Sequence, residues 1–136
     1  MNEILFSVRF YRGKVVGLLS LGEDDMLGDL HNIIQETLHW DSDHLYEFII
    51  DGTPRDKRAI YSCKADPGYA HESIFRGFAE QTKIGSLNLV QGQQFFYHFD
   101  YGDNWFFEIH VSEIREVQGI PPPKVLKRNG RMPKQY

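Results

Sequence analysis

The sequence has a single cysteine and no long apolar run, and each shortage excludes a class of protein. Cys63 is alone among 136 residues, so the chain cannot form an internal disulfide. No apolar stretch approaches the roughly 18 residues needed to span a bilayer, and the first residues lack the basic and apolar regions of a signal peptide. We therefore expect a cytoplasmic protein with no membrane partner.

The motifs of common catalytic and cofactor sites are also missing. The sequence has no glycine-rich phosphate loop, no nucleophile-elbow pattern and no paired cysteines of a zinc site. Nothing near Cys63 indicates an activated thiol. We therefore predict no catalytic residues, no cofactor and no resident metal.

What the chain does contain is typical of one globular domain with bulky core side chains. Hydrophobic residues make up 41% of the sequence and aromatic residues 14%, which is a high aromatic share. The net charge of −4 argues against a surface that binds nucleic acid throughout, because such binding depends on many Lys and Arg side chains. A local basic patch is still compatible with this charge.

The clearest local signal is the stretch FFYHFDYGDNWFFEIHV at residues 95–111. Two aromatic runs flank a short polar segment, which predicts a β-hairpin. We expect Gly102 to adopt the positive φ of a tight turn, and we expect Asp100, Asp103 and Asn104 to hydrogen-bond the backbone there.

Hydrophobic periodicity predicts several elements before this hairpin. Asp24 or Asp25 is the expected N-cap of a helix, because the apolar stripe of helical spacing begins directly after them. The expected elements, in chain order, are strands at residues 4–10 and 15–21, a helix over residues 27–38, a strand at 45–50, a short strand at 59–63, a short helix at 73–80 and a short strand at 84–89.

The predicted fold is therefore a single α+β domain with a largely antiparallel or mixed sheet and one main helix. Its order is β-β-α-β, an irregular region, and then the β-hairpin. We place the domain at residues 1–118, and residues 119–136 follow as a Pro-rich connector and a basic C-terminal tail.

Polar and aromatic side chains at the hairpin turn are the candidate binding residues. They are His98, Asp100, Tyr101, Gly102, Asp103 and Trp105. His98, Asp100 and Asp103 could also hold a divalent ion in a metal-dependent hydrolase, but the two aspartates more often serve as turn caps. Whether His110 approaches them depends on a hairpin register that the sequence does not give.

Other histidines and the tryptophans have simpler interpretations. His31 and His39 are too far apart on the predicted helix to chelate one ion, so we place them on its surface or boundary. Trp40 and Trp105 are expected to pack in the core rather than stack on a ligand.

The tail carries a cluster of positive charges that could contact nucleic acid. The candidates are Lys124, Lys127, Arg128, Arg131 and Lys134. Five charges over eleven residues do not define a site, and a solvated, partly docked C-terminus explains them as well.

Blocks of residues along the chain resemble the plasmid pRiA ORF-three-like family. The blocks are residues 30–35 (LHNIIQ) with His39-Trp40 and 44–48 (HLYEF), residues 83–87 (KIGSL), residues 99–105 (FDYGDNW), which is similar to the family's Tyr-Asp-Phe-Gly-Asp-x-Trp signature with Tyr101 in place of Phe, and residues 129–136 (NGRMPKQY). The chain departs from the family at residues 13–16, where many members carry Pro-x-Trp-Arg. It also lacks the Pro-Pro-Glu-Asp segment and the C-terminal extension of longer members.

The resemblance implies an α+β domain without established enzymatic activity, in a family associated with plasmids and insertion sequences. We accordingly expect a small, non-enzymatic binding or interaction module, with a protein as the favoured partner. The alternative is a nucleic-acid-associated accessory protein of a mobile element, which would use the basic tail.

Overall fold

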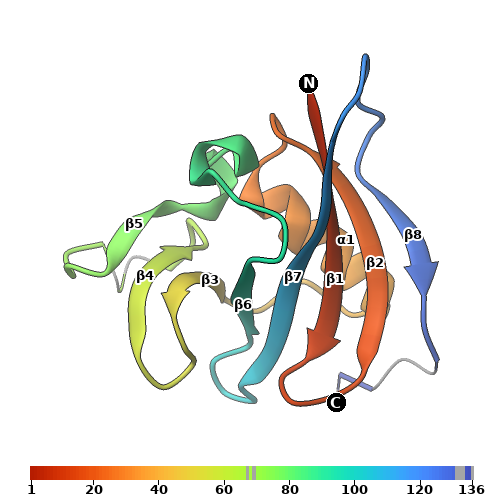
Figure 1. Cartoon of the computed structure of the whole chain (residues 1–136). Helices are drawn as coiled ribbons and strands as arrows, with labels where there is room; N and C mark the ends of the chain where they lie inside the picture. The colour runs from red at the N-terminus through yellow and green to blue at the C-terminus, as the bar shows by residue number, and fades with distance from the viewer. Residues whose placement is uncertain (67, 69, 131–133, 136) are drawn as a thin grey trace.

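A computed structural model describes residues 1–66, 68, 70–130 and 134–135 of the chain. Within these residues, eight strands form one sheet in the order β5-β4-β3-β6-β7-β1-β2-β8, accompanied by the helix α1 (Figure 1). The strands are β1 (Asn2–Phe10), β2 (Val15–Gly22), β3 (Tyr46–Gly52), β4 (Lys57–Ser62), β5 (Phe75–Phe78), β6 (Gln94–Phe99), β7 (Trp105–Glu116) and β8 (Lys124–Arg128). Only β4 and β5 pair in parallel among them, which confirms the predicted α+β fold with a mixed, largely antiparallel sheet.

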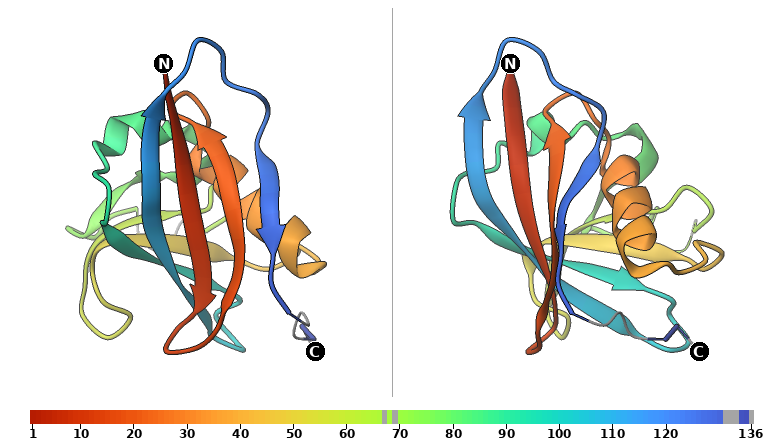
Figure 2. Two further views of the ribbon diagram at one scale, coloured as in Figure 1. Left: turned by 45° about the vertical axis from the view of Figure 1, so that its right-hand side comes forward. Right: turned by 90° about the vertical axis from the view of Figure 1, so that its right-hand side faces the viewer.

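The sheet is strongly curved, and α1 (Leu27–Leu38) lies against its concave side. In Figure 2 the strands β1, β2 and β8 run steeply across β3 and β6, and the helix lies in the space between these two groups. Aromatic and aliphatic side chains from both groups and from β7 fill that space, including the fully buried Phe6, Phe48 and Phe107. This packing explains why a chain of this length needs so many aromatic residues.

The predicted N-cap, Asp24 or Asp25, was wrong, although the helix occupies the predicted residues 27–38. Met26 is the N-cap, and its backbone N–H donates to Asp29 Oδ2 at 2.8 Å. Asp25 instead accepts a hydrogen bond from the backbone of Gly22 at 2.6 Å, which closes the turn before the helix. The helix ends at His39, whose left-handed φ of 57° stops the helical repeat.

The region after β3 differs most from the sequence-based expectation. The predicted strand at 59–63 is confirmed as β4, but the predicted helix at 73–80 is wrong: Phe75–Phe78 forms the edge strand β5, followed by the short 3₁₀ helix η2 (Ala79–Gln81). The predicted strand at 84–89 is also wrong, because Ile84–Leu87 forms the 3₁₀ helix η3. Three or four apolar residues fit either period, so tertiary pairing decided these short segments.

Residues of the predicted tail join the sheet. β8 pairs with β2 and forms one edge of the sheet, opposite to β5. No helix in the described part of the chain has the length and apolar character needed to cross a membrane.

Candidate binding pocket and polar network

The predicted hairpin is confirmed, with β6 and β7 paired from Gln94 opposite His110 to Phe99 opposite Trp105. Its turn geometry differs from the expectation, because the residues with positive φ are Asp100 (63°) and Asn104 (54°), whereas Gly102 has no positive φ. Asparagine and aspartate tolerate this region better than most residues. The prediction that Gly102 supplies the positive φ was therefore wrong.

Asp100 organises the turn with its carboxylate, as its sequence position predicted. Its Oδ1 accepts hydrogen bonds from the backbone N–H groups of Gly102 at 3.1 Å and Asp103 at 3.2 Å. Its Oδ2 lies 3.6 Å from Nε2 of His44. The side chain of Asp103, in contrast, is exposed and makes no hydrogen bond within the described chain.

We expect Asp100→Ala to lower the free energy of unfolding by about 1–2 kcal/mol, because it removes two backbone hydrogen bonds and leaves a β-carbon at positive φ. Gly102→Ala should change it by less than about 0.5 kcal/mol, since an added Cβ would meet only Asp100 Oδ1, at 3.4 Å. Urea denaturation of both variants measures the difference. A larger loss for Gly102→Ala than for Asp100→Ala would contradict this description of the turn.

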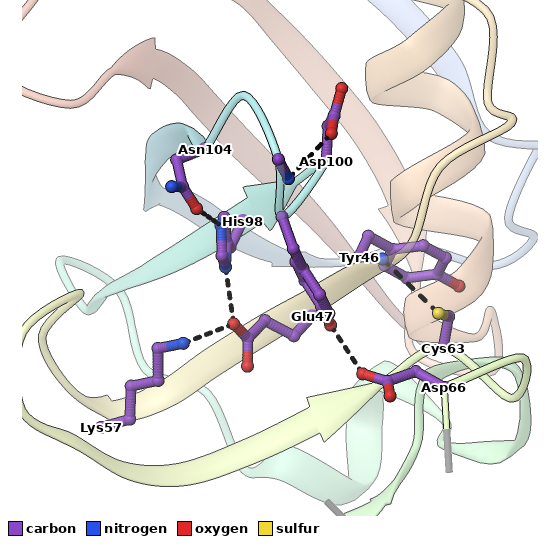
Figure 3. Close-up of polar contacts among 10 residues, drawn as sticks. Tyr46, Glu47, Lys57, Cys63, Asp66, His98, Asp100 and Asn104 are labelled. Carbon is purple, nitrogen blue, oxygen red and sulfur yellow. Dashed lines mark hydrogen bonds and ion pairs between the residues drawn. The ribbon is translucent and has the colours of Figure 1, made fainter. Parts of the chain in front are cut away.

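A buried polar network lies beside the hairpin, on the sheet face opposite to the helix (Figure 3). The Glu47 carboxylate on β3 is fully buried, and its Oε2 accepts hydrogen bonds from Lys57 Nζ at 2.7 Å and His98 Nδ1 at 2.6 Å. The other ring nitrogen of His98 contacts the Asn104 amide at 2.8 Å. The network thus joins β3, β4 and β6 to the last residue of the turn.

The carboxylate of Glu47 is held in its charged form by these partners. Burial by itself raises the pKa of Glu47, but the hydrogen bonds from His98 and Lys57 outweigh it and leave the pKa below its ordinary value. Glu47 Oε1 has no hydrogen-bond partner in the described structure, so all of the charge pairing is made through Oε2.

The two aromatic candidates of the turn are anchored inside the protein. The Tyr101 hydroxyl donates to Asp66 Oδ2 at 2.9 Å, and burial, followed by the Glu47 carboxylate, raises the pKa of this phenol. Trp105 packs against Trp40 with ring centroids 4.9 Å apart, and Trp40 is 8% exposed, so the predicted packing role of these tryptophans is confirmed. The Tyr101 hydroxyl therefore has a partner within the protein, whereas Trp105 Nε1 is buried without a hydrogen-bond partner in the described structure.

The remaining histidines do not join the turn. His110 lies opposite Gln94, at the far end of the hairpin from the Phe99–Trp105 pair, so it does not approach His98. Within the described chain, no group of three or more His, Cys, Asp or Glu is placed to hold a metal ion.

The basic candidates of the tail have different positions. Lys124, Lys127 and Arg128 lie on the edge strand β8 and are exposed, and Arg128 Nη2 donates to the Glu36 carbonyl at 3.3 Å. Lys134 is also exposed, whereas Arg131 lies outside the described residues.

A pocket of about 590 Å³ opens on the other side of the hairpin, between the start of α1, the loop into β3 and η2. Its lining includes three carboxylates, and neither Lys nor Arg contributes to it. The lining residues are Met26, Gly28, Asp29, His31, Asn32, Ser42, Asp43, His44, Leu45, Tyr46, Cys63, Ala65 and Glu80. A concave site of this size accommodates a small ligand or one or two side chains of a partner.

His31 was expected on the surface or boundary of the helix, and that prediction was wrong because the side chain is buried. It is 5% exposed, its ring stacks on Tyr46 with centroids 3.6 Å apart, and its Nδ1 lies 2.5 Å from the Tyr97 hydroxyl. Burial lowers the pKa of His31 to about 3, so the ring is neutral at physiological pH. The neutral ring of His31 therefore adds no positive charge to the pocket, in which Asp43 Oδ1 lies 3.3 Å from His44 Nε2.

The other pocket groups with shifted pKa values are also held in their neutral forms. Burial, followed by the nearby Glu80 carboxylate, raises the pKa of Tyr46, and burial raises the pKa of the Cys63 thiol. Both Glu80 oxygens accept a hydrogen bond from the backbone N–H of Lys64, at 3.0 Å each. The pocket therefore combines fixed negative charge at its rim with neutral, uncharged rings at its floor.

Comparison with known families agrees with the blocks seen in the sequence. The family model described as "Plasmid pRiA4b ORF-3-like protein" matches residues 11–135, which is nearly the whole chain. The chain belongs to the pRiA4b ORF-3-like family.

Two proteins similar to this pRiA4b ORF-3-like chain carry names that state no activity. An uncharacterized protein, y4hQ of Sinorhizobium fredii, is 27% identical over 110 residues, which cover 79% of this chain and 50% of that protein. The chain thus spans about half the length of that curated relative. The fold of the present chain resembles that of MM3350 of Methanosarcina mazei, a protein of unknown function. The two structures give a TM-score of 0.72 at 17% sequence identity, and the match covers 98% of this chain and 72% of that one.

Sequence reasoning on this pRiA4b ORF-3-like chain missed the central residues of both sites. One signal was present, because Glu47 interrupts the apolar run LYEFII and a charge at that position has to be paired. The pocket carboxylates Asp29, Asp43 and Glu80 come from separate segments and have no common spacing. Only the tertiary fold brings them together.

Proposed function

We propose that the protein is a non-enzymatic binding module and that the acidic pocket receives a positively charged group of its ligand. The single observation that supports this is the composition of the pocket lining, which contains Asp29, Asp43 and Glu80 but neither Lys nor Arg. Carboxylates around a concave, partly desolvated site attract an organic cation more strongly than the same charges on an open surface.

The hairpin turn has a supporting role in this proposal. Asp100 lies against His44, which lines the pocket, so the family signature turn helps to position one pocket wall. Tyr101 and His98 are occupied by Asp66 and Glu47, which leaves mainly exposed Asp103 and Gly102 for a partner that reaches over the rim. The favoured occupant is a cationic group, whether on a small molecule or on a protein partner.

An NMR titration of ¹⁵N-labelled protein with ethylamine, a minimal alkylammonium, tests the proposal. We expect shifts of the backbone amides that line the pocket, weaker at high salt, and no such shifts with propionate as the matched anion. Asp43→Asn should weaken ethylamine binding by about 2- to 5-fold, because the carboxylate is exposed and its contribution is that of a surface ion pair.

Asp56→Asn is the matched control for this titration, since Asp56 is exposed and lies outside the pocket lining. It should bind ethylamine like the wild type. Shifts that are scattered over the surface, or equal shifts with propionate, would contradict the proposed site.

Nucleic acid is the second candidate partner, supported by the exposed Lys124, Lys127 and Arg128 on the edge strand β8. A short DNA duplex added in the same experiment would shift the β8 amides in a salt-dependent way if this alternative holds. The cytoplasmic location and the association with mobile elements stay predictions.

A further inference from the structure

The floor of the pocket contains a polar atom that the protein itself leaves without a partner. His31 is 5% exposed and lines the pocket, and its Nδ1 is bonded to the Tyr97 hydroxyl. Its other ring nitrogen, Nε2, makes no hydrogen bond within the described part of the chain. Nε2 is not among the enclosed polar atoms that lack a partner, so solvent reaches it through the pocket, and a ligand atom that bonds to it replaces a water hydrogen bond with a directional one.

The direction of the hydrogen bonds around Tyr97 determines whether His31 Nε2 is a hydrogen-bond donor or acceptor toward a ligand. The Gln35 side-chain amide donates to the Tyr97 hydroxyl at 2.9 Å, and the arrangement that also uses the hydroxyl's own proton has the hydroxyl donate to Nδ1 of His31. In that arrangement the neutral ring accepts at Nδ1 and carries its proton on Nε2. The pocket floor thus presents an N–H donor, which requires an acceptor on the ligand.

The rim requires the opposite chemistry. Asp29, Asp43 and Glu80 attract a positive charge and disfavour a second carboxylate on the ligand, so the acceptor for His31 has to be neutral. The volume of about 590 Å³ leaves room for both groups on one small ligand.

We propose that the pocket recognises an ammonium group that carries a neutral hydrogen-bond acceptor a few bonds away, as in an α-amino amide or the amino terminus of a peptide. This inference rests on the proposed function and specifies its ligand. The carboxylates bind the ammonium group, and His31 Nε2–H donates to the neutral oxygen. Free amino acids are disfavoured, because their carboxylate would face the acidic rim.

Three matched probes of similar size test this ligand class by NMR titration at about pH 6, where both amines are protonated. Glycinamide has the ammonium group and the neutral oxygen, ethylamine has only the ammonium group, and acetamide has only the neutral amide. We expect glycinamide to bind about 3- to 10-fold tighter than ethylamine, the ratio that one added neutral hydrogen bond provides, and acetamide not to bind measurably. Glycyl peptides with a free or an acetylated amino terminus then test whether the ligand is the amino terminus of a polypeptide or a small molecule. Binding of the free peptide but not of the acetylated one would indicate a polypeptide amino terminus.

A variant and a spectroscopic signature test the role of the positioning residue Tyr97. In the wild type, ¹⁵N spectra of the imidazole should show the tautomer of His31 with its proton on Nε2. Tyr97→Phe removes the hydroxyl that fixes this tautomer, and the preference for glycinamide over ethylamine should disappear while ethylamine binding persists. If Tyr97→Phe does not fold, the ratio of glycinamide to ethylamine affinity in the wild type and the tautomer of His31 still test the inference.

The possible failures are distinct. Equal affinity for glycinamide and ethylamine, or a proton on Nδ1, would overturn this inference and leave the cationic pocket in place. Absence of binding by both amines would overturn the proposed function itself.

Discussion

Replacing Glu47 with alanine is expected to lower the free energy of unfolding by about 3–5 kcal/mol, the cost of removing one partner from a buried ion pair. The carboxylate is fully buried and bridges Lys57 and His98 through one oxygen. Without it, two donors that now share a negative charge face each other in a poorly solvated space, and His98 loses the contact that orients its ring toward Asn104. Chemical denaturation followed by tryptophan fluorescence measures the loss.

Asp56→Ala is the matched control for Glu47→Ala. Asp56 also pairs with a cation, Arg58, but both side chains of that pair are about two-thirds exposed. Its removal should change the free energy of unfolding by less than about 0.5 kcal/mol. Similar losses of unfolding free energy for the two variants would show that the burial of Glu47 does not determine how much this residue stabilises the fold.

The second large effect concerns pH. Burial lowers the pKa of His31 to about 3 from an ordinary value of 6.5, so between these values the unfolded chain binds a proton that the folded chain does not. Stability from this residue is therefore complete above about pH 6.5 and is lost as the pH falls. Between about pH 6.5 and 5, we expect the free energy of unfolding to decrease by about 2 kcal/mol because of His31.

His31→Gln separates this effect from the other titrating groups. Glutamine keeps a polar end that can contact the Tyr97 hydroxyl, but it does not titrate. The variant is expected to be less stable than the wild type at neutral pH and to show a shallower pH dependence, measured by denaturation at a series of pH values. If the free energy of unfolding depended on pH in the same way for both proteins, His31 would take up its proton as readily in the folded state as in the unfolded state, which would contradict the prediction.

The fold could be predicted where the sequence pattern is long. The helix stripe from Leu27 to Leu38 and the two aromatic runs of the hairpin extend over enough residues to distinguish a helical period from an alternating one. The segment Phe75–Phe78 is too short for that distinction, and its pairing with β4 gave it strand conformation. Local pattern and tertiary pairing disagreed only where the pattern was weak.

The candidate site was harder to predict because its residues are related by packing. The turn residues stood out as a motif, but Asp100 and Tyr101 bond within the protein, whereas the pocket is lined by residues from four separate segments. His31 looked like a surface residue because the sequence cannot show that Tyr46 and Tyr97, on two different strands, cover the helix at that point. Burial of a polar helix position becomes evident only in the folded structure.

The position of β1 between β2 and β7 has a consequence for how the chain is made. β1 can pair with β2 as soon as a short hairpin has been synthesised, but its other neighbour follows about a hundred residues later, as in the pairing of Glu3 with Arg115. Until then, the nascent hairpin has an unpaired edge that can recruit other chains. Closure of so long a loop slows folding. We therefore expect the sheet to be completed only after most of the chain has left the ribosome, and folding yield to depend on protection of that edge during translation.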